Sequence, residues 1–173
     1  MNDKMEGHSQ AYVYIRSMKT LREILEVATS FEKTARDFYR GLIPKVSKNI
    51  RYLVEELAEE EQEHFDLFAE MLSHPNVEQE LKTRVQVPME DHRFSDYVHV
   101  PELGDFPDDQ EILQYAMGRE DAAMKQYREL ADETAPGEIH DLFEFLANEE
   151  TKHKRELEAI YYELINSGGP SGV

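Results

Sequence analysis

The chain carries the same eight-residue pattern, L-A-x-E-E-x-x-H, once in each half. The first copy is Leu57–His64 and the second is Leu146–His153, a constant offset of 89 residues (57 to 146 and 64 to 153). Each copy places a Glu and a His three residues apart, which puts both side chains on one face of an α-helix. A chain with this duplication is constrained to bring two matching helix faces together.

A second shared pattern, Glu-x6-Tyr, precedes each copy. It pairs Glu32 with Tyr39 and Glu120 with Tyr127, at an offset of 88 residues (32 to 120 and 39 to 127). Together the two halves offer four Glu and two His side chains to one central point. In a helical bundle this is the ligand set of a carboxylate-bridged site for two metal ions. The predicted metal ligands are Glu32, Glu61, His64, Glu120, Glu150 and His153.

Four amphipathic stretches predict an all-α fold. They cover residues 20–45 and 48–72, then 108 to a break at 135–137, and from that break to 166. Thr20 and Glu23 form a capping-box pattern at the start of the first. Each apolar stripe has a Glu near its middle, where an unpaired carboxylate costs several kcal/mol. Two divalent cations would balance the four carboxylates, so metal binding explains this placement.

The segment between the second and third helices, residues 74–107, is too long for a tight turn. A helix of about 25 residues spans roughly 37 Å, and this segment is long enough to run back along it. The second and third helices are therefore expected to be parallel, which gives a four-helix bundle with one long crossover. We predict a single domain over residues 1–173, with the bundle at 20–166 and flexible tails.

Composition excludes several kinds of function. The sequence has no cysteine, so disulfides, thiolate zinc sites and iron–sulfur centres are excluded, and any metal must be held by oxygen and imidazole ligands. The net charge of −18 argues against a nucleic-acid partner. No apolar run approaches the roughly 18 residues of a membrane span. Because the N-terminus also lacks the apolar stretch of a signal peptide, we predict a cytoplasmic protein without a membrane partner.

Two pairs of residues have alternative interpretations. Glu60 and Glu149 also recur at the offset of 89, but they lie beside the apolar stripes. They are expected to be solvated or to contact the ligands rather than to be ligands themselves. Tyr39 and Tyr127 are either aromatic core residues or hydrogen-bond partners of the ligand carboxylates.

The ligand motifs and the two tyrosines resemble those of the ferritin-like superfamily, most closely its rubrerythrin-like branch, over residues 20–166. The resemblance implies two bound irons, with manganese as a substitute. We interpret Glu61 and Glu150 as bridging carboxylates. Glu32 and His64 complete the ligand set of one metal ion, and Glu120 and His153 complete that of the other. The predicted function is reduction of hydrogen peroxide or dioxygen. The alternatives are a ferroxidase with iron storage and a non-catalytic metal-binding bundle.

Two departures from the rubrerythrin-like pattern matter. A full-length rubrerythrin has a rubredoxin domain with four cysteine ligands, and this chain has no cysteine. Electrons are therefore expected from an external donor. The peroxidase type also has an extra Glu one turn after the third-helix ligand, and this chain has Ala123 there. The ligand exchange associated with that Glu is not expected here. We predict assembly as a homodimer or a higher homo-oligomer.

Overall fold

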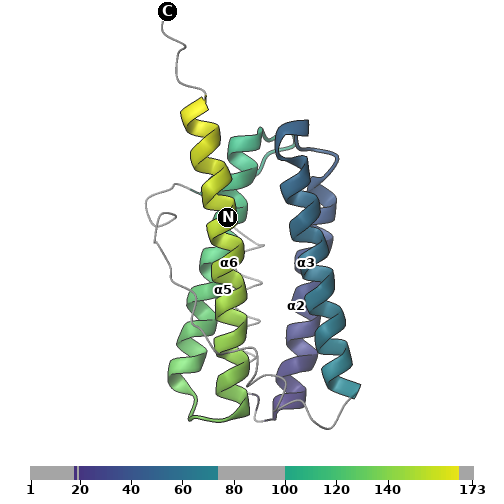
Figure 1. Ribbon diagram of the computed structural model, residues 1–173, viewed down its shortest axis with the longest axis vertical. Coiled ribbons are helices and arrows are strands. Elements are labelled where there is room, and N and C mark those ends of the chain that lie inside the picture. Colours follow the sequence, from purple (N-terminus) through teal and green to yellow (C-terminus); the bar gives the residue numbers. More distant parts are fainter. Residues whose placement is uncertain (1–17, 19, 74–99, 168–173) are drawn as a thin grey trace, which may run out of the picture.

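The computed structural model describes residues 18, 20–73 and 100–167, which form four long helices (Figure 1). These are α2 (Leu21–Leu42), α3 (Lys48–Ser73), α5 (Asp109–Glu133) and α6 (Glu138–Ser167). They confirm the predicted all-α four-helix bundle. The predicted bounds agree to within three residues; the first helix ends at Leu42 because Pro44 has no backbone N–H with which to continue the helix.

Two helices begin with a complete capping box. The Glu23 N–H donates to Thr20 Oγ1 at 3.2 Å, and the Thr20 N–H donates to Glu23 Oε2 at 3.1 Å. Asp108 and Glu111 make the same reciprocal pair at the start of α5, at 2.8 and 3.0 Å. Each box satisfies N–H groups that the first helical turn leaves without a partner. Local sequence therefore fixes where α2 and α5 begin.

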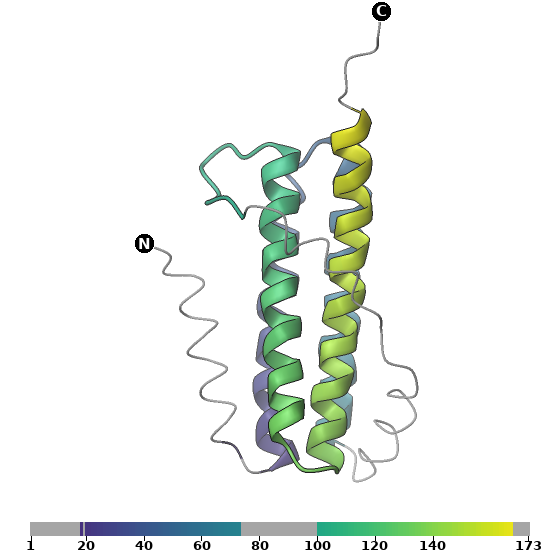
Figure 2. The same cartoon turned by 90° about the vertical axis from the view of Figure 1, so that its left-hand side faces the viewer.

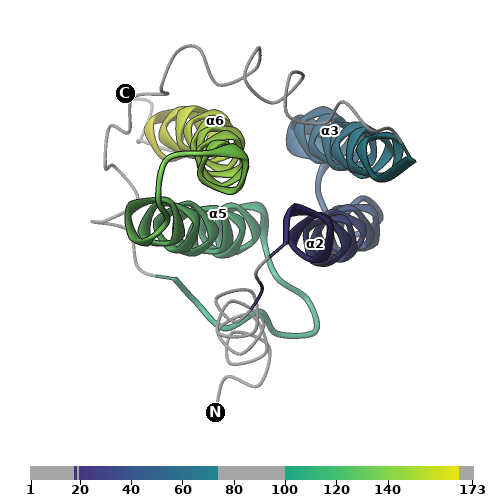
Figure 3. The same ribbon diagram turned by 90° about the horizontal axis from the view of Figure 1, so that it is seen from below.

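The helices form two antiparallel hairpins, α2–α3 and α5–α6, and Figure 2 shows α5 and α6 side by side. Viewed along the bundle, α2 lies beside α5 and α3 lies beside α6 (Figure 3). The end of α3 and the start of α5 lie at opposite ends of the bundle, so these two helices run parallel, as the crossover prediction requires (Figure 1). Residues 74–99 of the predicted crossover, and the N-terminal segment before Met18, lie outside the described residues.

The buried apolar side chains form two clusters, one toward each end of the bundle. Both draw on all four helices. The first includes Leu25, Phe68, Tyr127 and Leu146, and the second includes Tyr39, Leu57, Leu113 and Leu157. Between the two clusters lies a layer of buried Glu and His side chains. The apolar clusters hold the helices, and the layer between them forms the candidate site.

Two helical glycines differ in the space around them and give a paired stability test. A Cβ on Gly118 would lie 2.6 Å from Cγ2 of Val100, whereas a Cβ on Gly41 meets nothing within 4 Å. The variant Gly118→Ala is expected to lose about 1 kcal/mol, because overpacking of about 1–3 kcal/mol exceeds the gain in helix propensity. Gly41→Ala is expected to gain about 0.5 kcal/mol. Urea denaturation measures both, and a stabilised Gly118→Ala variant would contradict the contact with Val100.

Candidate metal centre

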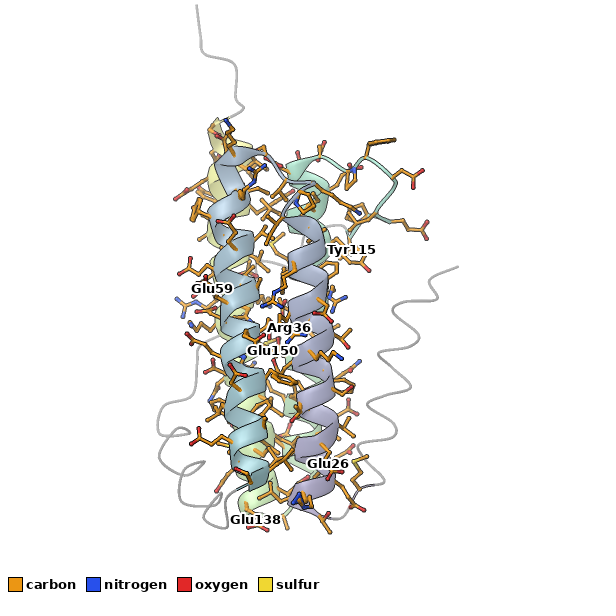
Figure 4. The ribbon with its side chains drawn as sticks, turned by 90° about the vertical axis from the view of Figure 1, so that its right-hand side faces the viewer. Glu26, Arg36, Glu59, Tyr115, Glu138 and Glu150 are labelled. Carbon is orange, nitrogen blue, oxygen red and sulfur yellow. The ribbon has the colours of Figure 1, made fainter. Side chains whose placement is uncertain are left out.

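The six predicted ligands come from all four helices and lie at one level of the bundle. Glu32 is on α2, Glu61 and His64 are on α3, Glu120 is on α5, and Glu150 and His153 are on α6. Figure 4 places Glu150 near the middle of the bundle's length, with Glu138 at one end. Four of the six are buried, and the side chains of His64 and Glu150 are each 13% exposed. The layer is thus largely shielded from solvent.

Five of the six side chains form two groups that share Glu61. One group, Glu32, Glu61 and His64, has His64 Nδ1 at 3.5 Å from Glu32 Oε2 and 3.6 Å from Glu61 Oε2. The other group consists of Glu61, Glu120 and His153. In it, His153 Nδ1 lies 3.3 Å from Glu61 Oε1 and 4.0 Å from Glu120 Oε2. The two imidazole rings stack with centroids 5.5 Å apart. Each group has the size and the donor atoms to hold a metal ion.

Glu150 is placed differently from Glu61. It belongs to neither group, although its Oε2 lies 3.9 Å from Nδ1 of His153. Burial and the neighbouring Glu120 carboxylate raise the pKa of Glu150 well above its usual value. The pair Glu61 and Glu150, equivalent in sequence, is therefore not equivalent in this geometry, in which Glu61 alone joins the two groups.

The second nitrogen of each imidazole faces a carboxylate of the opposite hairpin. Nε2 of His64 on α3 lies 2.8 Å from Oε2 of Glu149 on α6. Nε2 of His153 on α6 lies 3.2 Å from Oε2 of Glu60 on α3, and Lys152 donates to Glu60 at 2.6 Å. A carboxylate at Nε2 orients an imidazole so that Nδ1 faces the centre. Glu60 and Glu149 thus contact the candidate ligands, one of the two roles the sequence left open.

The two tyrosines are both fully buried. The hydroxyl of Tyr39 on α2 donates a hydrogen bond to Oε1 of Glu120 on α5, so this phenol contacts a candidate ligand of the other hairpin. Tyr127 packs in an apolar cluster and lines a small cavity beside Glu32 and Glu120. Tyr39 thus both packs in an apolar cluster and contacts a candidate ligand carboxylate, and the Tyr127 ring lies beside the site.

Charges in the layer are strongly coupled. Burial, together with the nearby Glu61 carboxylate, raises the pKa of Glu32 from its usual 4.5 to about 8. Burial alone would lower the pKa of His64, but its hydrogen bonds with Glu149 and Glu32 raise it to about 12. Burial also opposes ionisation of Glu61, yet the attraction of His153 holds the pKa of Glu61 below its usual value. The carboxylates and imidazoles of the layer thus shift one another's pKa values.

Several atoms at the centre that could ligate a metal make no hydrogen bond with any residue that the structure describes. These are Oε2 of Glu61 and both ring nitrogens of His153, all buried; Nε2 of His153 lies 3.2 Å from Glu60 but makes no hydrogen bond with it. Buried polar atoms nearly always have a hydrogen-bond partner, so each atom without one requires an explanation. Carboxylate oxygens and imidazole nitrogens are donors suited to iron and manganese. The residues present therefore fit a metal site.

The metal-free protein is expected to lose stability as the pH rises from 6.5 to 8. Glu32 has its pKa raised in the folded state, so its stabilising contribution is complete below about pH 4.5 and is lost as the pH rises through about 8. His64, raised from 6.5 to about 12, acts in the same direction above pH 6.5. Urea denaturation of metal-free protein at the two pH values measures this. Glu32→Gln should reduce the dependence, and equal stability of the wild type at both values would refute it.

Three charged residues near the centre were not anticipated from the sequence: Arg119, Asp121 and Lys154. Arg119 precedes Glu120 and stacks its guanidinium carbon 4.1 Å from the ring centroid of Phe38. Lys154 follows His153 and is fully buried, 2.9 Å from Oδ1 of Asp121. The available signal was position, since all three are neighbours of candidate ligands. Their residue types alone indicate solvated helix charges.

Four helices with one crossover around a buried layer of Glu and His define a ferritin-like bundle, with Glu/His groups that could hold metal ions. A sequence model of the rubrerythrin family matches residues 23–161. The chain belongs to the rubrerythrin family, whose members are di-iron carboxylate proteins. Comparisons with curated proteins and with solved structures gave no match. No helix in the described part of the chain is long and apolar enough to cross a membrane.

Proposed function

We propose that this protein is a di-iron oxidoreductase that reduces hydrogen peroxide or dioxygen. Glu32 and His64 would hold one iron, and Glu120 and His153 would hold the other. Glu61 would be shared by both, and Glu150, 3.9 Å from Nδ1 of His153, would be the second shared carboxylate; manganese is the substitute. The observation that supports this best is the position of Glu61, whose carboxylate is 1% exposed and is shared by two Glu/His groups. A buried carboxylate between two imidazoles is costly unless cations compensate its charge.

Two bound ferrous ions would supply one electron each. With two protons, these two electrons would reduce one hydrogen peroxide to two waters or one dioxygen to hydrogen peroxide, and an external donor would then return them. The protein residues orient and protect this chemistry. Glu149 and Glu60 face Nε2 of His64 and His153 and keep each Nδ1 directed inward. Tyr39 donates a hydrogen bond to Glu120 and fixes the orientation of that carboxylate. The apolar clusters on either side exclude bulk water.

The test begins with metal analysis of protein purified without oxygen. Two irons per chain are expected, followed by stopped-flow oxidation of the di-ferrous protein with peroxide and, separately, with dioxygen. Reaction with either oxidant at two irons per chain supports the proposal. A reduced protein that binds iron and reacts with neither oxidant would be a metal-binding bundle without this activity.

A ferroxidase would give a different result in the same experiment. In that case iron is substrate as well as cofactor, so repeated additions of ferrous iron and oxygen would accumulate more than two irons per chain. Iron retained at two per chain through repeated additions would exclude storage.

A further inference from the structure

A small cavity lies between α2 and α5, directly beside the candidate metal centre. Its volume is about 20 Å³, and roughly 10–15 Å³ on this measure already holds one water molecule. Three candidate ligands line it, each with a carboxylate: Glu32, Glu120 and Glu150. A cavity lined by three acids in a bundle core is not a packing defect between apolar side chains. A molecule of water size inside it would lie against three of the candidate ligands.

The walls of this cavity follow the internal duplication of the chain. Glu32 and Glu120 are equivalent at the offset of 88 residues, and so are Ala35 and Ala123, one turn further along each helix. Both alanines line the cavity, and neither side chain reaches across it. The space thus exists because the two halves each place a methyl group where α2 and α5 face each other. Larger side chains at these two positions would fill it.

One pair in the cavity wall breaks the duplication. Phe31 in the first half corresponds to Arg119 in the second, again at the offset of 88. The Arg119 guanidinium is positioned by the Phe38 ring, 4.1 Å away. An arginine stays charged at every physiological pH and presents several N–H donors. Among the residues that line the cavity, Arg119 is therefore a permanent cation that only one half of the chain contributes.

We propose that Ala35, Ala123 and Arg119, which line this cavity, select the oxidant that reaches the metal pair. Ala35 and Ala123 limit the pocket to hydrogen peroxide or dioxygen and exclude substituted hydroperoxides. Arg119 is the specificity-determining residue, which stabilises negative charge that develops on the oxygen atoms and disfavours a ferrous ion entering by this route. This inference rests on the proposed function, because it assumes a redox-active metal pair beside the pocket.

The size limit is tested first on the unmodified protein. Hydrogen peroxide should oxidise the di-ferrous protein about 100-fold faster than tert-butyl hydroperoxide, because the bulkier oxidant cannot reach the reactive geometry. Comparable rates with both oxidants would show that the cavity does not set the substrate size, and would overturn the proposal.

Filling the cavity is the second test. Ala123→Leu should retain two irons per chain but lose nitric oxide binding to the ferrous protein, read by electron paramagnetic resonance, and should slow peroxide oxidation about 100-fold. The matched control is Ala69→Leu, the same substitution on an exposed face of α3. If Ala123→Leu fails to bind iron, Ala35→Val provides a smaller filling of the same space. Unchanged nitric oxide binding in an iron-replete variant would place the oxidant elsewhere.

Arg119 is tested through anion affinity rather than activity alone. Arg119→Leu should weaken azide binding to the di-ferric protein about tenfold, because one charge-assisted interaction is lost. Arg119→Lys should retain most of the affinity. Equal azide affinity in the wild type and Arg119→Leu would remove Arg119 from the proposal. A wild-type protein that binds no iron would instead refute the proposed function, so the two failures are distinguishable.

Discussion

Glu61→Gln is expected to lose both metal ions, with affinity reduced by more than about 100-fold. Loss of a residue that only orients a ligand typically costs 10–100-fold, and Glu61 is the one side chain shared by both Glu/His groups. The amide keeps the size of the carboxylate but removes its charge, so neither metal position remains balanced. Iron content of anaerobically purified protein and the binding isotherm for ferrous ion measure this effect.

Two neighbouring substitutions on α3 serve as controls for Glu61→Gln, one without effect and one with an intermediate effect. Glu63→Gln changes an exposed carboxylate two residues away and should leave iron content unchanged. Glu60→Gln, which removes the charge facing Nε2 of His153, should weaken binding by about 10–100-fold. The order Glu61, Glu60, Glu63 in decreasing effect is the expected pattern. Full iron content in Glu61→Gln would show that a different carboxylate joins the two groups.

Asp121→Ala is expected to lower the free energy of unfolding by about 3 kcal/mol. The substitution removes a carboxylate 2.9 Å from the ammonium group of Lys154, whose side chain is completely buried. Glu158, one turn further along α6, lies at 3.9 Å and compensates less well. Removing one partner of a buried ion pair typically costs about 3–5 kcal/mol because the other charge stays desolvated. Urea denaturation of the metal-free protein measures this loss.

Replacing the other member of this ion pair should lower the free energy of unfolding by less. In Lys154→Met, Asp121 keeps its ion pair with Lys125 at 2.6 Å, and its side chain is 18% exposed, so no buried charge is isolated. The double variant Asp121→Ala/Lys154→Met should be more stable than Asp121→Ala alone, since Met fills the space without a charge. A double variant that is less stable than Asp121→Ala would show that the ammonium group stabilises the fold through other contacts.

The helices and their inward faces could be predicted from the sequence because both depend on local rules. Thr20 with Glu23 and Asp108 with Glu111 set two helix starts through capping, a feature of four consecutive residues. The three-residue spacing of Glu61 and His64 fixes their common face through helical periodicity. Met71, Met117 and Met124 lie on the inward faces of these helices and are each 1% exposed.

Contacts across the bundle could not be predicted in the same way. Helical periodicity decides which side of a helix a residue occupies, but the neighbouring helix and its axial offset depend on packing of the whole core. For this reason the sequence left open whether Glu149 and Glu60 are solvated, and the fold places them at His64 and His153 of the opposite hairpin. The same applies to Tyr39, which contacts Glu120 across the α2–α5 boundary.

The sequence by itself determined the four helices, the duplicated ligand faces and the need for positive charge at their meeting point. These follow from residue spacing and from the cost of burying carboxylates. Only the tertiary structure decided that Glu61 joins the two groups while Glu150 lies to one side, that Lys154 is buried, and that Arg119 lines a cavity. Equivalent positions in a duplicated sequence become inequivalent because each packs against neighbours that the duplication did not preserve.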